Sequence, residues 1–205
     1  MHREQLMRIS PLIPLARADA FAGPLTQAMA DFGIDTPEQQ AQFMAQALQE
    51  SGYLQRLVEN LNYSPAGLRA TFGNRFTEAQ AEQYGRTPAH PANQRQIAVI
   101  AYGGRLGNRP GTEDGWLCRG RGIFQLTGRD NYTACGEALG LDLLDDPALL
   151  EGPDVACQSA GWFWTANGLN KMDDVRSITR KINGPAMLGL AERTNFYERA
   201  LAVLA

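Results

Sequence analysis

The chain has 205 residues, of which 44% are hydrophobic and 20% charged, and its formal net charge at pH 7 is −3. This composition is ordinary for a soluble globular protein, and the length predicts one domain over residues 1–205 with one substantial core and two lobes at most. The charge balance excludes a global attraction to nucleic acid or anionic lipid, and no apolar run approaches the roughly 18 residues of a membrane span.

The chain begins with two short predicted helices. They cover residues 3–10 and 18–33 and are separated by a proline-bounded turn at Pro11–Pro14. The second repeats apolar residues at helical spacing, and Gly33 closes it. Two prolines and an early glutamate make this N-terminus a poor signal peptide. We therefore expect synthesis in the cytoplasm without an evident export signal.

The next predicted helix carries a glutamate at its end. Thr36 is a suitable N-cap, Pro37 suits the first helical position, and Gln39 completes a capping box. Gly52 lies just beyond the other end, where a left-handed residue is expected. Glu50 is then placed at the negative end of the helix dipole, beside apolar side chains. Both features disfavour the charged carboxylate, so we expect a raised pKa for Glu50, as a general acid requires.

A second glutamate, Glu59, precedes a polar run that contains Asn60, Asn62 and Ser64. This setting is wetter and rich in amides, so we expect Glu59 to stay ionised. Two carboxylates whose environments push their pKa values apart suit an acid and a base. Two glutamates nine positions apart are more often solvated surface charges, so that spacing alone does not establish catalysis.

The rest of the chain is predicted to be mainly helical. The stretch 103–128 is the exception, because eight glycines in 26 residues indicate turns and close backbone approaches, with a short strand or hairpin at Ile123–Thr127. The expected helices are Pro65–Phe72, Thr77–Tyr84, one containing Ile97 and Ile100, Asn131–Leu139, one from Pro153 to Gly168, one marked by Val175, Ile178 and Ile182, and Leu190–Leu204.

Metal and cofactor chemistry have no support in the sequence. The two histidines, His2 and His90, lie in no catalytic or metal-binding motif, and no acidic loop has calcium spacing. The segment Arg119–Gly122 lacks the Lys-Ser/Thr ending and the preceding strand of a phosphate loop, so nucleotide binding is rejected. We expect no metal, no cofactor and no nucleic acid.

Cysteine and arginine usage indicate the setting of the protein. The odd number of cysteines argues against a disulfide scaffold and for a reducing compartment of synthesis; Cys118, Cys135 and Cys157 are expected to be buried small hydrophobes.

The tightest basic group in the sequence consists of Arg119, Arg121 and Arg129. It is narrower than phosphate binding usually needs.

Amide, hydroxyl and aromatic side chains in the sequence are candidates for lining a sugar-binding cleft. Sugars offer hydroxyls for hydrogen bonds and apolar ring faces for stacking. The alternative for each polar residue is a local role in capping a helix or turn. The candidates are Gln125, Thr127, Asn131, Asn183, Tyr63, Trp116 and Tyr132.

Four motifs in order carry a family resemblance. AQALQESG, VENLNYS, GWLCRGRGIFQLTGRDNY and KINGP resemble the family 19 glycoside hydrolases, and within them the short bacteriophage endolysins rather than the plant chitinases. The resemblance runs from roughly Ile9 to the C-terminus. It implies a lysozyme-like α+β fold, mainly α, in which a large helical lobe and a small β element flank a cleft.

The resemblance also implies roles for particular residues. Glu50 matches the general acid, Glu59 the general base, and the Thr127 hydroxyl lies near the attacking water. Gln49 stands where the family usually has a histidine before the acid. The implied substrate-binding residues are Tyr63, Gln125, Asn131, Asn183 and Arg193.

The function implied is that of an endolysin. Such a protein hydrolyses β-1,4 bonds in peptidoglycan strands with inversion, and inversion implies carboxyl groups roughly 6.5–9.5 Å apart. We expect a monomer that reaches the periplasmic wall with the help of a holin and does not insert stably into membranes. One alternative is a chitinase. Another is a non-catalytic glycan-binding protein, which the presence of Glu50, Glu59 and Thr127 disfavours.

Overall fold

A computed structural model describes all 205 residues, and the chain is mainly helical. It divides into two compact units. Unit 1 consists of Met1–Leu57, Gly122–Gln125 and Ala148–Ala205, and unit 2 consists of Val58–Arg121 and Leu126–Pro147. The chain therefore passes from one unit to the other at four points. That the whole chain is a single domain stays a prediction.

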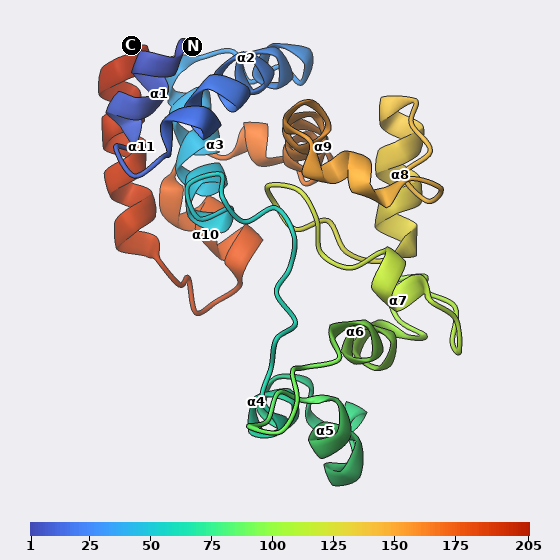
Figure 1. Cartoon of the computed structure of the whole chain (residues 1–205). Coiled ribbons are helices and arrows are strands. Elements are labelled where there is room, and N and C mark those ends of the chain that lie inside the picture. Colours follow the sequence, from blue (N-terminus) through green and yellow to red (C-terminus); the bar gives the residue numbers. More distant parts are fainter. The chain divides into compact units, whose positions relative to one another are not determined.

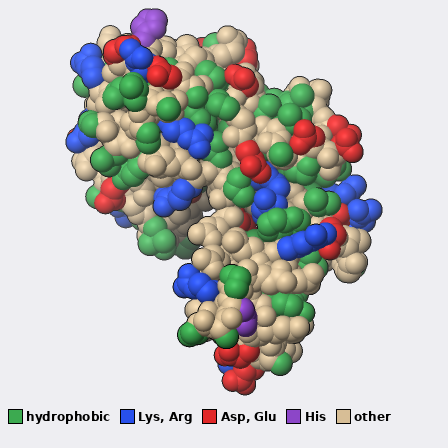
Figure 2. All heavy atoms as spheres, viewed as in Figure 1, with side chains coloured by type: hydrophobic (Ala, Val, Ile, Leu, Met, Phe, Trp, Pro, Cys, Tyr) green, Lys and Arg blue, Asp and Glu red, His purple; other side chains and the backbone are tan.

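The surface carries charges of both signs. On the face shown in Figure 2, basic and acidic side chains are interspersed and hydrophobic side chains lie between them. None of the helices combines the length and the hydrophobicity that crossing a bilayer requires.

Unit 1 is a bundle of helices in which α3 packs against α11 and α2 packs against α9 (Figure 1). The helix predicted over residues 18–33 begins earlier, at Leu15, and tolerates Pro24 inside it. The helices are α1 (Arg3–Ile9), α2 (Leu15–Asp31), α3 (Pro37–Glu50), α9 (Pro153–Ala166), the 3₁₀ turn η3 (Leu169–Lys171), α10 (Val175–Asn183) and α11 (Leu190–Leu204); the 3₁₀ turn η2 (Pro147–Glu151) contains the last crossing between the units.

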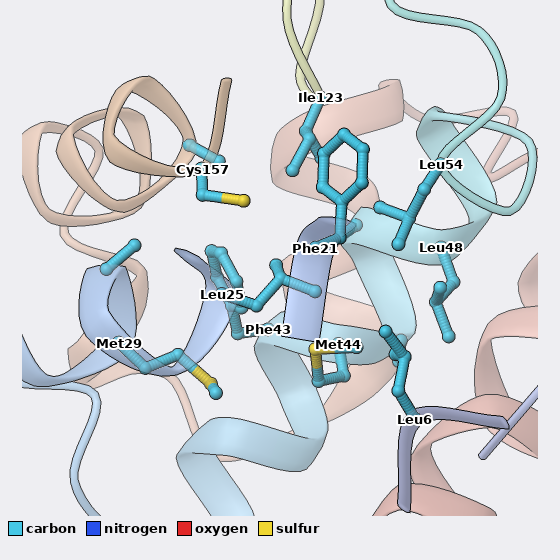
Figure 3. Packing of buried hydrophobic residues seen from close by; sticks show 14 of the residues in the cluster. Leu6, Phe21, Leu25, Met29, Phe43, Met44, Leu48, Leu54, Ile123 and Cys157 are labelled. Atoms are coloured by element: carbon cyan, nitrogen blue, oxygen red, sulfur yellow. The ribbon is translucent and has the colours of Figure 1, made fainter. Parts of the chain in front are cut away.

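The core of unit 1 surrounds α3. Phe43 lies edge-on to Phe124 and Trp164, with ring centroids 5.9 and 5.3 Å away. Burying one large apolar side chain contributes about 1.5–3 kcal/mol, so this helix is firmly held. Figure 3 shows the cluster, which includes Leu6, Phe21, Leu25, Met29, Phe43, Met44, Leu48, Leu54, Ile123 and Cys157.

The ends of α3 follow the local signals in the sequence. The Thr36 hydroxyl accepts a 3.2 Å hydrogen bond from the Gln39 N–H, and the Gln39 side chain accepts one from the Thr36 N–H, which completes the predicted capping box. Gly52 adopts a left-handed φ of 53°. Tyr53 and Leu54 are also left-handed, at 64° and 63°, which costs non-glycine residues about 1–2 kcal/mol each. This turn leads the chain away from Glu50.

Unit 2 is also helical. Its small core gathers Leu61, Leu68, Phe76, Ala81, Ile97, Ala98 and Ala101. The short helix α7 within the glycine-rich stretch was not predicted. The helices are α4 (Pro65–Phe72), the 3₁₀ turn η1 (Gly73–Arg75), α5 (Glu78–Tyr84), α6 (Gln94–Tyr102), α7 (Asp114–Leu117) and α8 (Arg129–Leu139).

The β structure is smaller than predicted. It consists of two antiparallel bridges, Val58 with Arg121 and Arg121 with Leu126. The strand predicted at Ile123–Thr127 does not form, because residues 122–125 make a turn between Arg121 and Leu126. Ile123 in that turn is fully buried in the unit 1 core, which explains its apolar character without a strand. The mainly helical, lysozyme-like fold class is nevertheless confirmed.

The three cysteines are buried, as predicted, and the structure shows that all three are free. Burial raises the pKa of the Cys135 thiol to about 12. It also raises the pKa values of Cys118 and Cys157. These thiols behave as small apolar side chains in the interior.

Candidate active site

Glu50 lies at the C-terminal end of α3 and keeps 22% of its side chain exposed. Its Oε1 accepts a hydrogen bond from Arg193 Nη2 at 2.5 Å, within an ion pair. No side chain or backbone group of the protein bonds its Oε2. One carboxyl oxygen is thus held in place while the other is available to a substrate.

Arg193 reaches Glu50 from α11 and is itself only 2% exposed. Its Nη1 donates to Gln46 Oε1, and its Nε donates to the Leu188 carbonyl at 3.3 Å. Gln46 Nε2 in turn donates to the Thr179 hydroxyl at 3.1 Å. Three helices, α3, α10 and α11, therefore hold Arg193 through a buried polar chain. Because each member is bonded to the next, the buried guanidinium is both paired and satisfied.

Sequence reasoning missed Gln46 and Thr179. A signal for Gln46 exists, since Gln42 and Gln46 are polar residues one turn apart among the apolar interior positions of α3, and Gln46 lies one turn before Glu50. The argument for a protonated Glu50 considered the helix dipole and the apolar neighbours but no cation. Arg193 was predicted to bind substrate. In the structure it contacts Glu50 directly, and it would stabilise the carboxylate that remains after a proton is donated.

Asn183 ends α10 and closes the loop to α11. Its Oδ1 accepts a 2.7 Å hydrogen bond from the Leu188 N–H, while its Nδ2 bonds no other group of the protein. In the same loop Gly189 has a left-handed φ of 73°, and a Cβ there would approach Gln49 Nε2 to 2.5 Å. Gln49, which stands where the resemblance noted above implies a histidine, therefore packs against bare backbone beside Glu50.

Glu59 is held in unit 2 by neutral donors. The Tyr102 hydroxyl lies 2.7 and 2.9 Å from its two carboxyl oxygens, and the Gly120 N–H donates to Oε2 at 3.2 Å. The Glu59 N–H donates back to the Gly120 carbonyl at 2.9 Å. Tyr102 was not predicted, and its place at the end of α6 carries no local signal for this contact.

Burial raises the pKa of Glu59 above its usual range. The hydrogen bonds from Tyr102 and Gly120, and the charges of Arg119 and Arg121, act in the opposite direction but do not cancel the burial. The polar run after Glu59 suggested a wetter setting than the one found. A raised pKa makes a carboxylate a stronger proton acceptor, as a general base requires.

Arg119 and Arg121 are part of the frame around Glu59. The Arg119 guanidinium lies 3.7 Å from the centre of the Trp116 ring and donates to the Trp116 carbonyl at 2.9 Å. Arg121 donates to the Tyr132 hydroxyl at 3.0 Å, and that hydroxyl donates to the Arg119 carbonyl at 2.5 Å. Trp116 and Tyr132, which were considered as sugar contacts, thus support these two arginines.

Of the four remaining predicted residues, two make local side-chain hydrogen bonds and a third makes an aromatic contact. Gln125, in unit 1, has a left-handed φ of 51° and donates to the Gly122 carbonyl at 3.0 Å. In unit 2, Asn131 Nδ2 donates to the Thr127 carbonyl at 2.7 Å. Tyr63 lies edge-on to Phe72 at 5.4 Å, partly buried. The local capping role thus holds for Gln125, Asn131 and also Asn183, and the side-chain amides of Asn131 and Asn183 each keep one polar atom without a partner in the protein.

Two pairs of predicted site residues are in direct contact, one pair in each unit. Glu50 and Arg193 meet in unit 1, and Thr127 and Asn131 meet in unit 2. Glu50 and Glu59 belong to different units, so the distance between their carboxyl groups stays a prediction. No group of His, Cys, Asp and Glu side chains is placed to hold a metal ion.

Comparison with known proteins gives matches over most of the chain. Residues 77–199 match the family model described as chitinase class I. A glycosyl hydrolase family 19 domain-containing protein of Haemophilus influenzae is 42% identical over 170 residues, which are 80% of this chain and 79% of that protein. An endochitinase of Arabidopsis thaliana is 42% identical over 85 residues, only 38% of this chain and 30% of the plant protein.

Solved structures share the fold. Chitinase C from Streptomyces griseus superimposes with a TM-score of 0.61 at 22% identity, covering 98% of this chain and 75% of that one. A bacterial family 19 chitinase gives a TM-score of 0.62 at 21% identity, covering 100% of this chain and 94% of that one. At such identities the likeness establishes the fold alone.

Proposed function

This chain belongs to glycoside hydrolase family 19, and from that premise we propose that it is an endolysin that hydrolyses β-1,4 bonds of bacterial peptidoglycan. The observation that carries the proposal is the fraction of the chain that aligns with the bacterial relative. Similarity to the Haemophilus influenzae protein extends over four fifths of both chains, whereas the plant endochitinase matches 38% of this chain. Three free, buried thiols also suit a chain made in a reducing compartment.

In the proposed reaction Glu50 is the general acid. Its free Oε2 carries the proton and donates it to the glycosidic oxygen as the bond from that oxygen to C1 breaks. Arg193, 2.5 Å from Oε1, supports this step because it stabilises the carboxylate as the proton leaves. The guanidinium is fixed by Gln46 before the reaction, so no reorganisation is needed.

Glu59 is the proposed general base. Its carboxylate takes a proton from a water, whose oxygen forms the new bond to C1 from the opposite face of the sugar. The Tyr102 hydroxyl and the Gly120 N–H orient the carboxylate, and the Thr127 hydroxyl is proposed to position the water. The product has the inverted anomeric configuration. Inversion requires carboxyl groups roughly 6.5–9.5 Å apart in the complex with substrate.

Substrate contacts complete the proposal. Tyr63, Gln125, Asn131 and Asn183 are proposed to bind the sugar strand, since Asn183 and Asn131 each keep an oxygen or nitrogen free of intramolecular bonds. We further propose that the protein acts as a monomer on the wall in the periplasm, after a holin opens the inner membrane.

A digest of purified peptidoglycan tests the proposed function. Mass spectrometry of the products, with chitin oligomers treated in parallel at matched enzyme concentration and low salt, identifies the bond that is cut. We expect peptidoglycan to be cut faster and permeabilised Gram-negative cells to be cleared. Much faster cleavage of chitin oligomers would contradict the endolysin proposal and favour a chitinase, the activity that the names of the plant relatives state for those proteins.

The anomeric configuration of the first product distinguishes an inverting from a retaining mechanism. Proton NMR of the fresh products should show the inverted configuration. A covalent glycosyl adduct trapped on Glu59 would contradict the proposed role of that residue. Binding of glycan strands without any cleavage would instead favour a non-catalytic glycan-binding protein.

A further inference from the structure

Helix α10 in unit 1 carries a basic groove. Its lining consists of Met172, Arg176, Ser177, Arg180 and Lys181, and its volume is about 630 Å³. All four residues from the helix are exposed. We call this feature the α10 groove.

The helix period explains why these side chains share one face. Arg176 and Arg180 are one turn apart, as are Ser177 and Lys181, so the two pairs form adjacent rows. Val175 and Ile178 are buried on the opposite face. The cations therefore point away from the core of unit 1 in a fixed arrangement.

The three cations of the α10 groove form no close ion pair, although Arg176 lies near enough to Asp174 for its charge to act on that carboxylate. None of them belongs to any ion pair within unit 1, although the chain as a whole has a net charge of −3. Asp174, at the start of the same helix, uses its carboxylate to accept a 2.8 Å hydrogen bond from the Ser177 N–H. A groove with three cations outside any close ion pair is complementary to a ligand with several carboxylates.

The basic group identified from the sequence behaves differently. Arg121 donates to the Leu117 carbonyl at 2.6 Å and to Tyr132, and Arg129 lies 3.5 Å from the carboxylate of Asp114. Those cations are engaged within unit 2. The cations of the α10 groove, which the linear sequence did not single out, are the ones left for a ligand.

We propose that the α10 groove binds the free carboxylates of the peptide stems attached to peptidoglycan strands. The inference rests on the proposed function and adds a determinant of substrate choice to it. Arginine matches a carboxylate with two parallel hydrogen bonds, and lysine adds a point charge. Chitin consists of uncharged amino sugars and offers nothing for these cations to bind.

The position of the groove on α10 suits this role. Asn183, a proposed sugar contact, ends the same helix, and at about 1.5 Å per residue the four helix residues of the groove lie roughly 3–11 Å from it along the axis. A stem of three to five residues extends roughly 10–18 Å, which covers that span. Thr179 on the same helix accepts a hydrogen bond from Gln46, which in turn accepts one from Arg193. Helix α10 therefore contributes both to the groove and to the polar network that contacts Glu50.

The test compares two triple variants. One is Arg176→Gln/Arg180→Gln/Lys181→Gln. The control is Arg8→Gln/Arg69→Gln/Arg199→Gln, which removes the same charge from exposed positions elsewhere. Both are made in the Glu50→Gln background for binding, so that substrate is not consumed, and in the active enzyme for kcat/KM. Circular dichroism and thermal unfolding verify that each variant is folded.

The ligands are intact Gram-negative sacculi, the same sacculi after an amidase has removed their stems, and chitin hexamer. We expect the groove variant to bind intact sacculi roughly 3- to 100-fold more weakly, the range for three exposed ion pairs. Its binding to stripped strands and to chitin should equal that of the control. The deficit should shrink as salt is raised, because salt screens exposed charges.

Three results would overturn the inference. Unchanged binding to intact sacculi would show that the groove has no part in recognition. An equal loss of binding to stripped strands would show that the α10 groove contacts sugar or supports the fold. Loss of binding to phosphatidylglycerol vesicles, with sacculi unaffected, would assign it to a lipid surface.

The proposed function can fail separately. If the active enzyme cuts chitin but no peptidoglycan, that proposal falls. The binding comparison in the Glu50→Gln background still decides whether stems are bound.

Discussion

The surroundings of Glu50 and Glu59 differ in the kind of group that holds each carboxylate. Glu50 ends a buried helix and is met by a charged guanidinium 143 residues further along the chain. Glu59 lies in an irregular segment and is met by a phenol and a peptide N–H, both neutral. Neutral donors bond the Glu59 carboxylate directly while the charges of Arg119 and Arg121 also act on it, whereas Glu50 is bonded by a buried cation that is costly to leave unpaired.

This difference gives the two sites different sensitivities. Around Glu50, a substitution should act on both stability and chemistry, because Arg193 is buried and needs its partners. Around Glu59, substitutions should act mainly on the protonation of the carboxylate, since burial and hydrogen bonds oppose each other there. The predictions below test this contrast.

The largest effect is expected for Glu50→Gln. Removing the proton donor should reduce kcat by about 10² to 10⁴ while the protein stays folded. Lysis of permeabilised cells and cleavage of purified peptidoglycan measure the effect. Glu38→Gln, an exposed glutamate in the first turn of the same helix, is the control and should be fully active. A folded Glu50→Gln variant with near-normal activity would remove Glu50 from the mechanism.

Arg193→Met should destabilise the protein strongly. It leaves Gln46 and Glu50 without their partner, and breaking a buried ion pair costs about 3–5 kcal/mol. Because Glu50 is 22% exposed and can be hydrated, we expect the lower end of that range. Urea unfolding measures the free energy. Arg199→Met, an exposed position on the same helix, should change it by less than about 0.5 kcal/mol. Equal effects of the two variants would contradict the proposed network.

Tyr102→Phe should move the acid limb of activity toward higher pH. The Tyr102 hydroxyl donates to the charged form of Glu59 and so lowers its pKa; without that bond the pKa rises further and the base is protonated at higher pH. The pH profile of kcat/KM measures this, and the loss should be several-fold greater at low pH than at pH 8. Tyr84→Phe, whose hydroxyl makes no hydrogen bond in the protein, should leave the profile unchanged. A shift toward lower pH would contradict the assignment of Glu59 as base.

The smallest effect is expected for Glu59→Gln on thermal stability. Burial raises the folded-state pKa of Glu59, so its contribution to stability is full below the unfolded-state pKa and is lost as pH rises through the folded-state value. Gln carries no charge to bury. Its Tm should therefore exceed that of the wild type by a few degrees at pH 7, and the difference should disappear under acidic conditions. A lower Tm at pH 7 would show that the hydrogen bonds outweigh the burial.

Local signals in the sequence determined most of the helices. Thr36, Pro37 and Gln39 cap α3, and Gly52 ends it, because capping and left-handed backbone depend on residues within one turn. The mainly helical fold and the position of Glu50 at a helix end follow from these signals. The motifs that point to family 19 are likewise contiguous stretches, so they can be recognised without coordinates.

Only the tertiary structure decided what surrounds the two glutamates. Arg193 and Gln46 meet across 147 positions, and Tyr102 reaches Glu59 across 43. Ile123 lies in a turn rather than a strand because the core of unit 1 buries it. Such contacts depend on how distant segments pack, and neither helical period nor capping carries that information. Burial and hydrogen-bond partners set the charge state of a carboxylate, so the chemistry of Glu59 could not be derived from its neighbours in sequence.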